Sequence, residues 1–262
     1  MEKLKIAITL TGTDTAGEEI VRKICEDTAL LELCTPKVFS SAEAGKDADA
    51  QVLVPTVEPT KCPADAVEII VTEQVNFMPL DKEPTADDVV KFRDILERDF
   101  DLRSPRIAIV QETDMQNPNL ATQVTEEQGI NTYGPYTVEK FKEDNAACHF
   151  DGIITVGDNA MLQRILTELS LEVPVRFYAG REAVVTAIYQ PVKKEETEEG
   201  LDDVSALTHP FYTAIDVIRN RAFYDEARQN PLPKLFRDKR EDRKKDDVQQ
   251  QNKPDSQDEE QS

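Results

Sequence analysis

Short apolar runs rich in β-branched residues alternate along this chain with segments of helical periodicity, and no other feature restricts the fold as strongly. Continuous apolar strands are typical of parallel sheets that helices cover on both faces. We therefore predict an α/β fold with a mainly parallel sheet and helices on both faces. The predicted strands are Leu4–Leu10, Val67–Val71, Arg106–Val110, Gly152–Val156, Val175–Tyr178 and Ala183–Tyr189. The predicted helices are Gly17–Asp27, residues 85–100, Ala160–Leu169 and Pro210–Arg228.

The segment 85–100 carries the clearest helical pattern. Thr85 stands where an N-cap belongs, and Asp88 follows three residues later, at the acidic position of a capping box. One face of the segment is apolar and contains Val89, Phe92, Leu96 and Phe100. We expect this helix to pack on the sheet through that face.

Two segments depart from the alternation. Residues 41–66 are rich in Ala, Asp, Pro and Lys and predict a loop or a weakly ordered connection. From Pro231 the chain is almost entirely polar, with a basic block at 234–245 and an acidic block at 246–260. We predict one α/β domain over residues 1–230, of one lobe or two, and a disordered charged tail over residues 231–262.

The charge balance restricts the partners. The 262 residues include 52 acids and 31 bases, for a formal charge of −21. Nucleic-acid binding needs a surplus of Lys and Arg, so we expect no nucleic-acid partner. Since no run approaches the ~20 apolar residues of a membrane span, we expect no membrane insertion either.

The four cysteines predict the compartment. Cys25, Cys34, Cys62 and Cys148 are spaced for neither a zinc site nor a disulfide framework. We expect free thiols, which are typical of the reducing cytoplasm.

The turn Thr11–Gly17 after the first strand could present backbone N–H groups to an anion. It matches neither a dinucleotide-binding fingerprint nor a P-loop, and Asp14, Glu18 and Glu19 would repel a phosphate. An ordinary strand-to-helix turn is the preferred interpretation.

Histidine is scarce. His149 and His209 lie 60 positions apart, and we expect structural roles for both. Cys148 adjoins His149, but neighbouring residues on an extended chain point to opposite faces, which is a poor geometry for proton transfer.

Three acids follow predicted strands at the edge where α/β sheets usually place their sites. These are Glu112, Asp114 and Asp158, and together they could bind Mg²⁺. In a chain with 52 acids, some fall at strand ends by chance, so a magnesium site is kept as an alternative and not as the main hypothesis.

Several ordered segments together resemble a known family. The strongest match runs from Ala214-Ile215-Asp216-Val217-Ile218-Arg219-Asn220-Arg221 through Ala227 to Leu232. Shorter matches are Ile6–Thr9, Ser104–Ile109, Gly134–Tyr136 and Phe150–Ile153. The chain resembles the 4-hydroxythreonine-4-phosphate dehydrogenase family of pyridoxal phosphate (vitamin B6) biosynthesis. It would be a shortened and divergent member, because the region between Phe39 and Val67 is shorter than the family's.

The resemblance implies a homodimer of two-lobed α/β subunits that oxidises a phosphorylated hydroxy amino acid with NAD. The family holds a divalent metal with three histidines, and this chain lacks a histidine at each matching position. Phe77 stands in the motif like H-I-P-L, Met115 in the motif like N-P-H-A-G, and Asp158 in the motif like Y-H-D-Q-G.

The family's substrate-binding positions also differ in this chain. Its Lys, Asn and Arg would fall at Leu166, Arg176 and Val185. The family's T-A-G-L-P stretch is present only as Tyr178-Ala179-Gly180. The positive charges that would hold a phosphate are therefore reduced.

These replacements predict no catalytic residue, no metal ligand and no bound cofactor, with cofactor-binding residues unassigned. The leading hypothesis is a non-catalytic scaffold or partner subunit that forms a homodimer or a heterodimer with a relative. One alternative is an NAD-dependent dehydrogenase with a rebuilt site at Asp114 and Asp158. Another is a small-ligand-binding module whose positive charge comes from Arg164, Arg176 and Arg181.

Overall fold

The computed structural model describes most of the chain. The described residues are 3–10, 15–39, 48–54, 62–111, 117–143, 146–171, 175–188 and 204–230. Residues 1–224 form one compact unit and residues 225–262 a second. The predicted charged tail at 231–262 lies outside the described residues, so that prediction stays untested.

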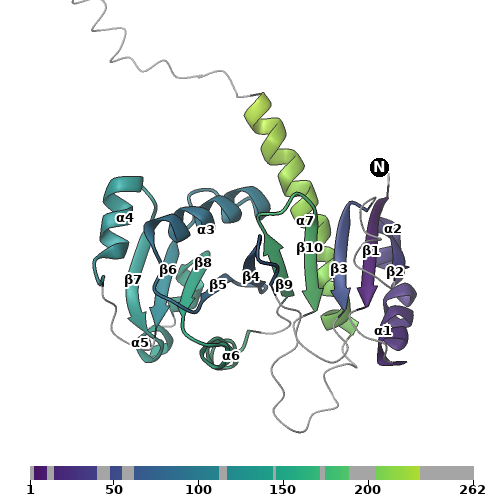
Figure 1. Ribbon diagram of the computed structural model, residues 1–262, viewed down its shortest axis with the longest axis horizontal. Helices are drawn as coiled ribbons and strands as arrows, with labels where there is room; N and C mark the ends of the chain where they lie inside the picture. Colours follow the sequence, from purple (N-terminus) through teal and green to yellow (C-terminus); the bar gives the residue numbers. More distant parts are fainter. Residues whose placement is uncertain are drawn as a thin grey trace, which may run out of the picture. The chain divides into compact units, whose positions relative to one another are not determined.

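Ten strands and seven helices make up the described fold (Figure 1). The strands are β1 (Leu4–Leu10), β2 (Cys34–Phe39), β3 (Ala50–Val54), β4 (Val67–Val71), β5 (Asn76–Leu80), β6 (Ile107–Gln111), β7 (Thr132–Thr137), β8 (Gly152–Val156), β9 (Val175–Ala179) and β10 (Val184–Ile188). The helices are α1 (Thr15–Glu26), α2 (Thr28–Leu33), α3 (Ala86–Asp99), α4 (Leu120–Gln128), α5 (Val138–Glu143), α6 (Asn159–Glu168) and α7 (Val204–Gln229). None of the described helices combines the length and apolar character needed to cross a membrane.

All ten strands form one sheet in the order β2-β1-β3-β10-β9-β4-β5-β8-β6-β7. The strands β2-β1-β3-β10 are mutually parallel, and so are β5-β8-β6-β7. Between these halves, β9 is antiparallel to both β10 and β4, and β4 is antiparallel to β5. The strands of the two halves therefore run in opposite directions. The carboxyl ends of the strands in one half lie on the same side of the sheet as the amino ends of the strands in the other half.

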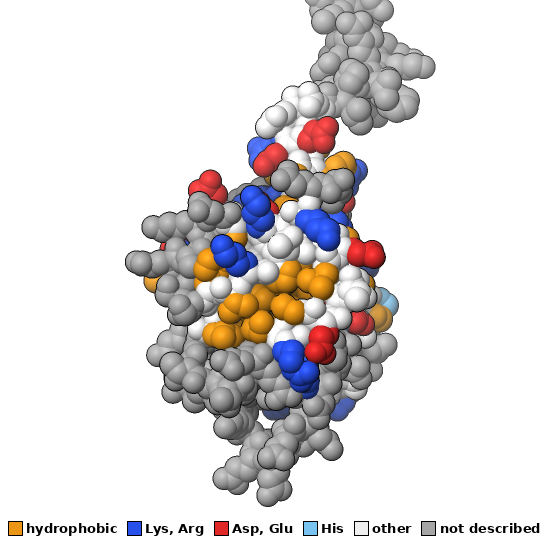
Figure 2. Space-filling model, turned by 90° about the vertical axis from the view of Figure 1, so that its right-hand side faces the viewer, with side chains coloured by type: hydrophobic (Ala, Val, Ile, Leu, Met, Phe, Trp, Pro, Cys, Tyr) orange, Lys and Arg blue, Asp and Glu red, His pale blue; other side chains and the backbone are white. Residues whose placement is uncertain are grey.

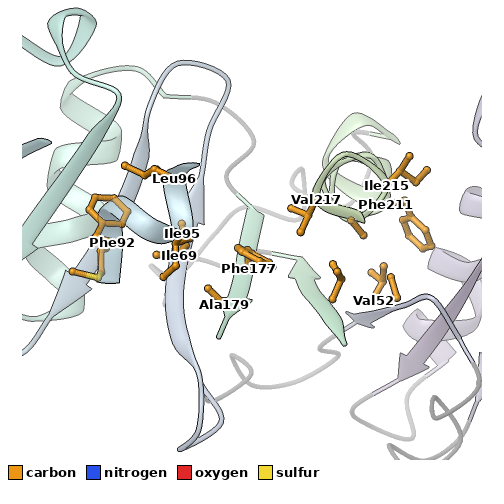
Figure 3. Close-up of a cluster of buried hydrophobic side chains, with 14 of the residues drawn as sticks. Val52, Ile69, Phe92, Ile95, Leu96, Phe177, Ala179, Phe211, Ile215 and Val217 are labelled. Carbon is orange, nitrogen blue, oxygen red and sulfur yellow. The ribbon is translucent and has the colours of Figure 1, made fainter. Parts of the chain in front are cut away.

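Among the described residues, helices cover one face of the sheet, and in the β5-β8-β6 half they cover the other face as well. One face packs against α3 and α7 in a large apolar cluster that includes Phe92, Phe177 and Phe211 (Figure 3). The opposite face of the β5-β8-β6 half packs against α5 and α6, through residues such as Phe141 and Ile165. The predicted α/β class with a mainly parallel sheet is confirmed.

Two predicted boundaries are corrected. The segment 41–66 contains β3, an apolar run that pairs with both β1 and β10, so it is not a loop throughout. The last helix begins at Val204 rather than Pro210, and Pro210 lies inside it. Leu207 and Phe211 are buried on either side of this proline. Their packing holds the first turns of α7 on the sheet.

The capping box predicted for α3 is present. The Asp88 N–H donates to Thr85 Oγ1 (3.3 Å), and the Thr85 N–H donates to Asp88 Oδ2 (2.9 Å). Burial raises the pKa of Asp88, but the hydrogen bonds from Thr85 and the charges of Lys91 and Lys82 together more than offset it and leave that pKa below its usual value.

Thr85→Ala removes this box, and we expect it to lower the free energy of unfolding by about 1 kcal/mol. Thr85→Ser keeps the hydroxyl and should recover most of the loss. Urea denaturation followed by circular dichroism measures both. Equal midpoints for the alanine variant and the wild type would contradict the stabilising role of the cap.

Candidate functional site

Phe77 lies in an interior strand of the sheet and is fully buried. It is in β5, where the register places it beside Ile153 of β8 and Ile70 of β4. All three side chains belong to the apolar cluster that packs against α5 and α6. The position that would carry the first histidine of the family is therefore part of the hydrophobic core in this chain.

Two further positions from the resemblance also have structural roles. Leu166 of α6 is buried in the same cluster as Phe77. Asp158 is exposed and is the N-cap of α6, where its Oδ1 accepts the Met161 N–H (3.0 Å). Its carboxylate thus satisfies one of the free N–H groups at the helix start.

These side chains do not fit a divalent metal. The phenyl ring of Phe77 has no donor atom, and Asp158 supplies one carboxylate where such ions need several oxygen or nitrogen ligands. Within the described ranges, no group of three or more His, Cys, Asp or Glu side chains is arranged to hold a metal ion. Met115, at the position of the remaining family histidine, lies outside the described residues.

Part of the alternative acidic site also lies outside the described residues. Glu112 and Asp114 fall in the undescribed segment 112–116, so their distance from Asp158 is untested. Residues 11–14 of the turn before α1 also lie outside the described residues. The alternatives built on these residues stay predictions.

At the junction between the two sheet halves, β4 and β9 bring a charged pair together with a tyrosine and a cysteine. Arg176 Nη1 donates to Glu68 Oε1 across the two strands. The register sets Tyr178 opposite Glu68, and Cys62 precedes β4 and packs nearby. We call Glu68, Arg176, Tyr178 and Cys62 the junction cluster.

Burial keeps the neutral members of the junction cluster protonated. It raises the pKa of Tyr178 far above its usual value, and Arg176 only partly opposes this effect. It also raises the pKa of the Cys62 thiol to about 11, with a further increase from the Glu68 charge. Neither the Tyr178 hydroxyl nor the Cys62 thiol is ionised near neutral pH, so the cluster does not supply an activated nucleophile. Its role is structural, because the pair of Arg176 and Glu68 joins β9 to β4.

The thiols should therefore react at two different rates. At pH 8, we expect iodoacetamide to modify the exposed Cys25 and Cys148 about a hundredfold faster than Cys62 and Cys34, because the thiolate is the reactive form. Burial raises the pKa of Cys34 to about 11 as well. Time-resolved peptide mass spectrometry measures each rate. A Cys62 rate equal to that of Cys148 would contradict the buried junction cluster.

The three arginines proposed for ligand binding are engaged by carboxylates. Arg176 pairs with Glu68 in the junction cluster, and Arg181 Nε lies 3.4 Å from Asp65 Oδ2. Arg164 is on α6, where its Nη2 lies 3.4 Å from Glu139 Oε1. Their charges are thus partly neutralised.

The two histidines lie on separate elements. His149 is exposed at the end of the short 3₁₀ helix Ala146–His149. His209 of α7 has its Nε2 3.8 Å from Glu73 Oε1. It lines a groove of about 430 Å³ together with Thr72, Glu73, Val175, Tyr212 and Asp216, among others.

The helix with the strongest resemblance is a structural element. Arg221 of α7 donates from Nε to Oδ1 of the fully buried Asp99 (2.8 Å), and Asn220 Nδ2 donates to the Asp99 carbonyl (2.9 Å). Arg98 donates to both oxygens of the same carboxylate (2.7 and 2.9 Å). Arg221 also reaches the carbonyls of Arg181 and Glu182. Sequence reasoning missed this network, which joins the end of α3 to α7.

Comparisons with known proteins agree with the resemblance. No family model matches the chain. The 4-hydroxythreonine-4-phosphate dehydrogenase of Bacteroides thetaiotaomicron is 31% identical over 175 residues, which are 62% of this chain and 47% of that protein. The chain thus spans about half the length of the curated relative that it matches.

A solved structure from Salmonella typhimurium, assigned to a 4-hydroxythreonine-4-phosphate dehydrogenase, superimposes with a TM-score of 0.53. The match has 13% identity and covers 82% of this chain and all of that chain, so it shows a shared fold. The chain is therefore similar in sequence to one 4-hydroxythreonine-4-phosphate dehydrogenase over 62% of its length, and it shares the fold of the solved structure.

Proposed function

We propose that this chain is a non-catalytic relative of the dehydrogenases, which has lost metal-dependent oxidation with NAD and serves as a scaffold or partner subunit. The observation that carries the proposal is the burial of Phe77 in an apolar cluster, at the position where the resemblance places a metal-binding histidine. A bound metal would polarise the hydroxyl that is oxidised and stabilise its developing negative charge.

The surroundings of Phe77 support the same proposal. Leu166 stands where the resemblance places a lysine, and it packs in the cluster that contains Phe77. A metal ligand and a phosphate-binding charge have both been replaced by apolar side chains that stabilise the fold. Regaining the reaction would need polar groups inside this core, which is costly. The proposal therefore implies no functional metal or NAD site.

A partner role is supported by hydrophobic side chains left on the surface. Val38 of the edge strand β2 is 45% exposed, and Phe223 of α7 is 51% exposed. On the side where β2 lies, hydrophobic side chains form a band with basic side chains above and below it (Figure 2). We propose a homodimer or a heterodimer with a relative, in the cytoplasm, where the four free cysteines stay reduced.

Two measurements on the full chain test this function. An assay with NAD, Mg²⁺ or Zn²⁺ and the phosphorylated hydroxy amino acid should give no NADH absorbance above a no-enzyme control. Light scattering and co-purification from the native host should give a dimer or a stoichiometric relative. Turnover would contradict the loss of catalysis, and a monomer that recovers no partner would contradict the subunit role.

A further inference from the structure

A pocket that the proposed function does not use lies at the β2 end of the sheet. It has a volume of about 410 Å³ and lies against β1 and β2. Its lining residues are Lys5, Ile6, Ala7, Thr35, Lys37, Phe39 and Ala48. This volume falls within the range of small-molecule sites.

The parallel register of β1 and β2 builds the pocket. Lys5 lies opposite Thr35, and Ala7 lies opposite Lys37. Because side chains alternate along a strand, these residues share one face of the sheet with Phe39. The other face of both strands carries Ile6, Ile8 and Cys34, which belong to the large apolar cluster. The two lysines are therefore held on the same side of adjacent strands by the core behind them.

The charges in the pocket favour an anion. Lys37 Nζ lies 5.3 Å from the centroid of the Phe39 ring, and within the described part of the chain neither Lys5 nor Lys37 forms an ion pair. The nearby Asp49 carboxylate instead accepts the backbone N–H of Lys5 (2.7 Å). Lys5 and Lys37 lie diagonally on adjacent strands and line one pocket, so in a protein of net charge −21 they mark a local site where an anion would lower the electrostatic energy.

The pocket also has an apolar side. Phe39 is partly buried, and the small side chains of Ala7 and Ala48 line the same pocket. Aromatic and small apolar residues of this kind receive flat rings, and the Thr35 hydroxyl adds a donor next to the lysines. Basic groups, one hydroxyl and an aromatic wall thus line the same cavity.

We propose that this pocket binds a small organic phosphate with a planar ring, of the class of nucleoside monophosphates. The phosphate contacts Lys5, Lys37 and Thr35, and the ring contacts Phe39 and Ala48. Binding here needs no metal and is independent of the residues that replace the family's catalytic histidines.

Isothermal titration of the full chain with adenosine monophosphate tests this assignment. We expect saturable binding that weakens about tenfold in Lys5→Gln and in Lys37→Gln, since each loses a charge-assisted hydrogen bond. Lys91→Gln changes the same charge on the exposed surface of α3 and should bind like the wild type. Phe39→Leu should weaken the nucleotide but leave the affinity for inorganic phosphate unchanged.

Three results would overturn the assignment. One is no binding of adenosine monophosphate at about millimolar concentration. Another is equal affinity for adenosine, which lacks the phosphate. The last is equal affinity for inorganic phosphate, which would leave a simple anion site with no role for Phe39. Circular dichroism of every variant confirms that it is folded.

Discussion

Arg221→Ala should lower the free energy of unfolding by about 3 kcal/mol, because it breaks a buried charged network. Among the described residues, the fully buried Asp99 carboxylate would keep Arg98 alone as a charged partner. The variant also loses the hydrogen bonds from Arg221 to the carbonyls of Arg181 and Glu182 and its cation–π contact with Phe177. Guanidinium denaturation with far-ultraviolet circular dichroism measures the loss.

Two variants control this experiment. Arg219→Ala removes an exposed arginine from the same helix and should leave the denaturation midpoint nearly unchanged. Arg221→Lys keeps the charge but cannot form the same set of hydrogen bonds, so we expect an intermediate loss. If Arg221→Ala and Arg219→Ala have the same midpoint, the network does not stabilise the junction of α3 and α7.

Phe77→His restores the family's residue type and should still destabilise the protein, by about 3 kcal/mol. The imidazole would replace a fully buried phenyl ring between Ile70 and Ile153. The loss should grow below about pH 6.5, because the apolar site keeps the folded histidine neutral while the unfolded histidine takes up a proton. Urea denaturation at pH 8 and pH 5.5 measures both effects.

Phe223→His is the matched control, because Phe223 is 51% exposed and its replacement should change stability little. Addition of Zn²⁺ should not raise the melting temperature of Phe77→His, since one histidine in an apolar cluster cannot form a metal site. A rise in the presence of Zn²⁺ would contradict our description of this position as core.

The predicted elements were those whose apolar pattern is uninterrupted. The runs at β1, β4, β6, β8, β9 and β10 were recognised, as was the capping box of α3. Four strands were missed. Three of them, β2, β5 and β7, each contain a proline, at Pro36, Pro79 and Pro135, and β3 lies within the segment predicted as a loop. Proline lacks the N–H that a strand uses for pairing and is read as a break.

The topology explains why these prolines are tolerated. β2 and β7 are the two edge strands, so one side of each has no neighbouring strand in the sheet. In β5, the pairing with β4 covers only Asn76 and Phe77, so Pro79 lies beyond it and pairs on one side, with β8. Such long-range pairing cannot be read from local sequence.

The sequence identified residues of the candidate site, but it did not show whether their side chains are buried or what they contact. The resemblance pointed to Phe77, Leu166 and Asp158, but only the fold shows that two of them are core and the third caps a helix. The contact between Asp99 and Arg221 joins residues 122 positions apart, so no local pattern could reveal it.

Calorimetric titration with NAD, in the presence and absence of Mg²⁺ or Zn²⁺, tests the loss of the metal site most directly. The Lys5→Gln/Lys37→Gln variant is titrated in parallel, so that binding of the nucleotide part at the β1–β2 pocket is separated from binding at a metal site. We predict that the metals change neither the heat nor the affinity in either protein. Metal-dependent binding of NAD would contradict the account, because it would require a working metal site in this chain.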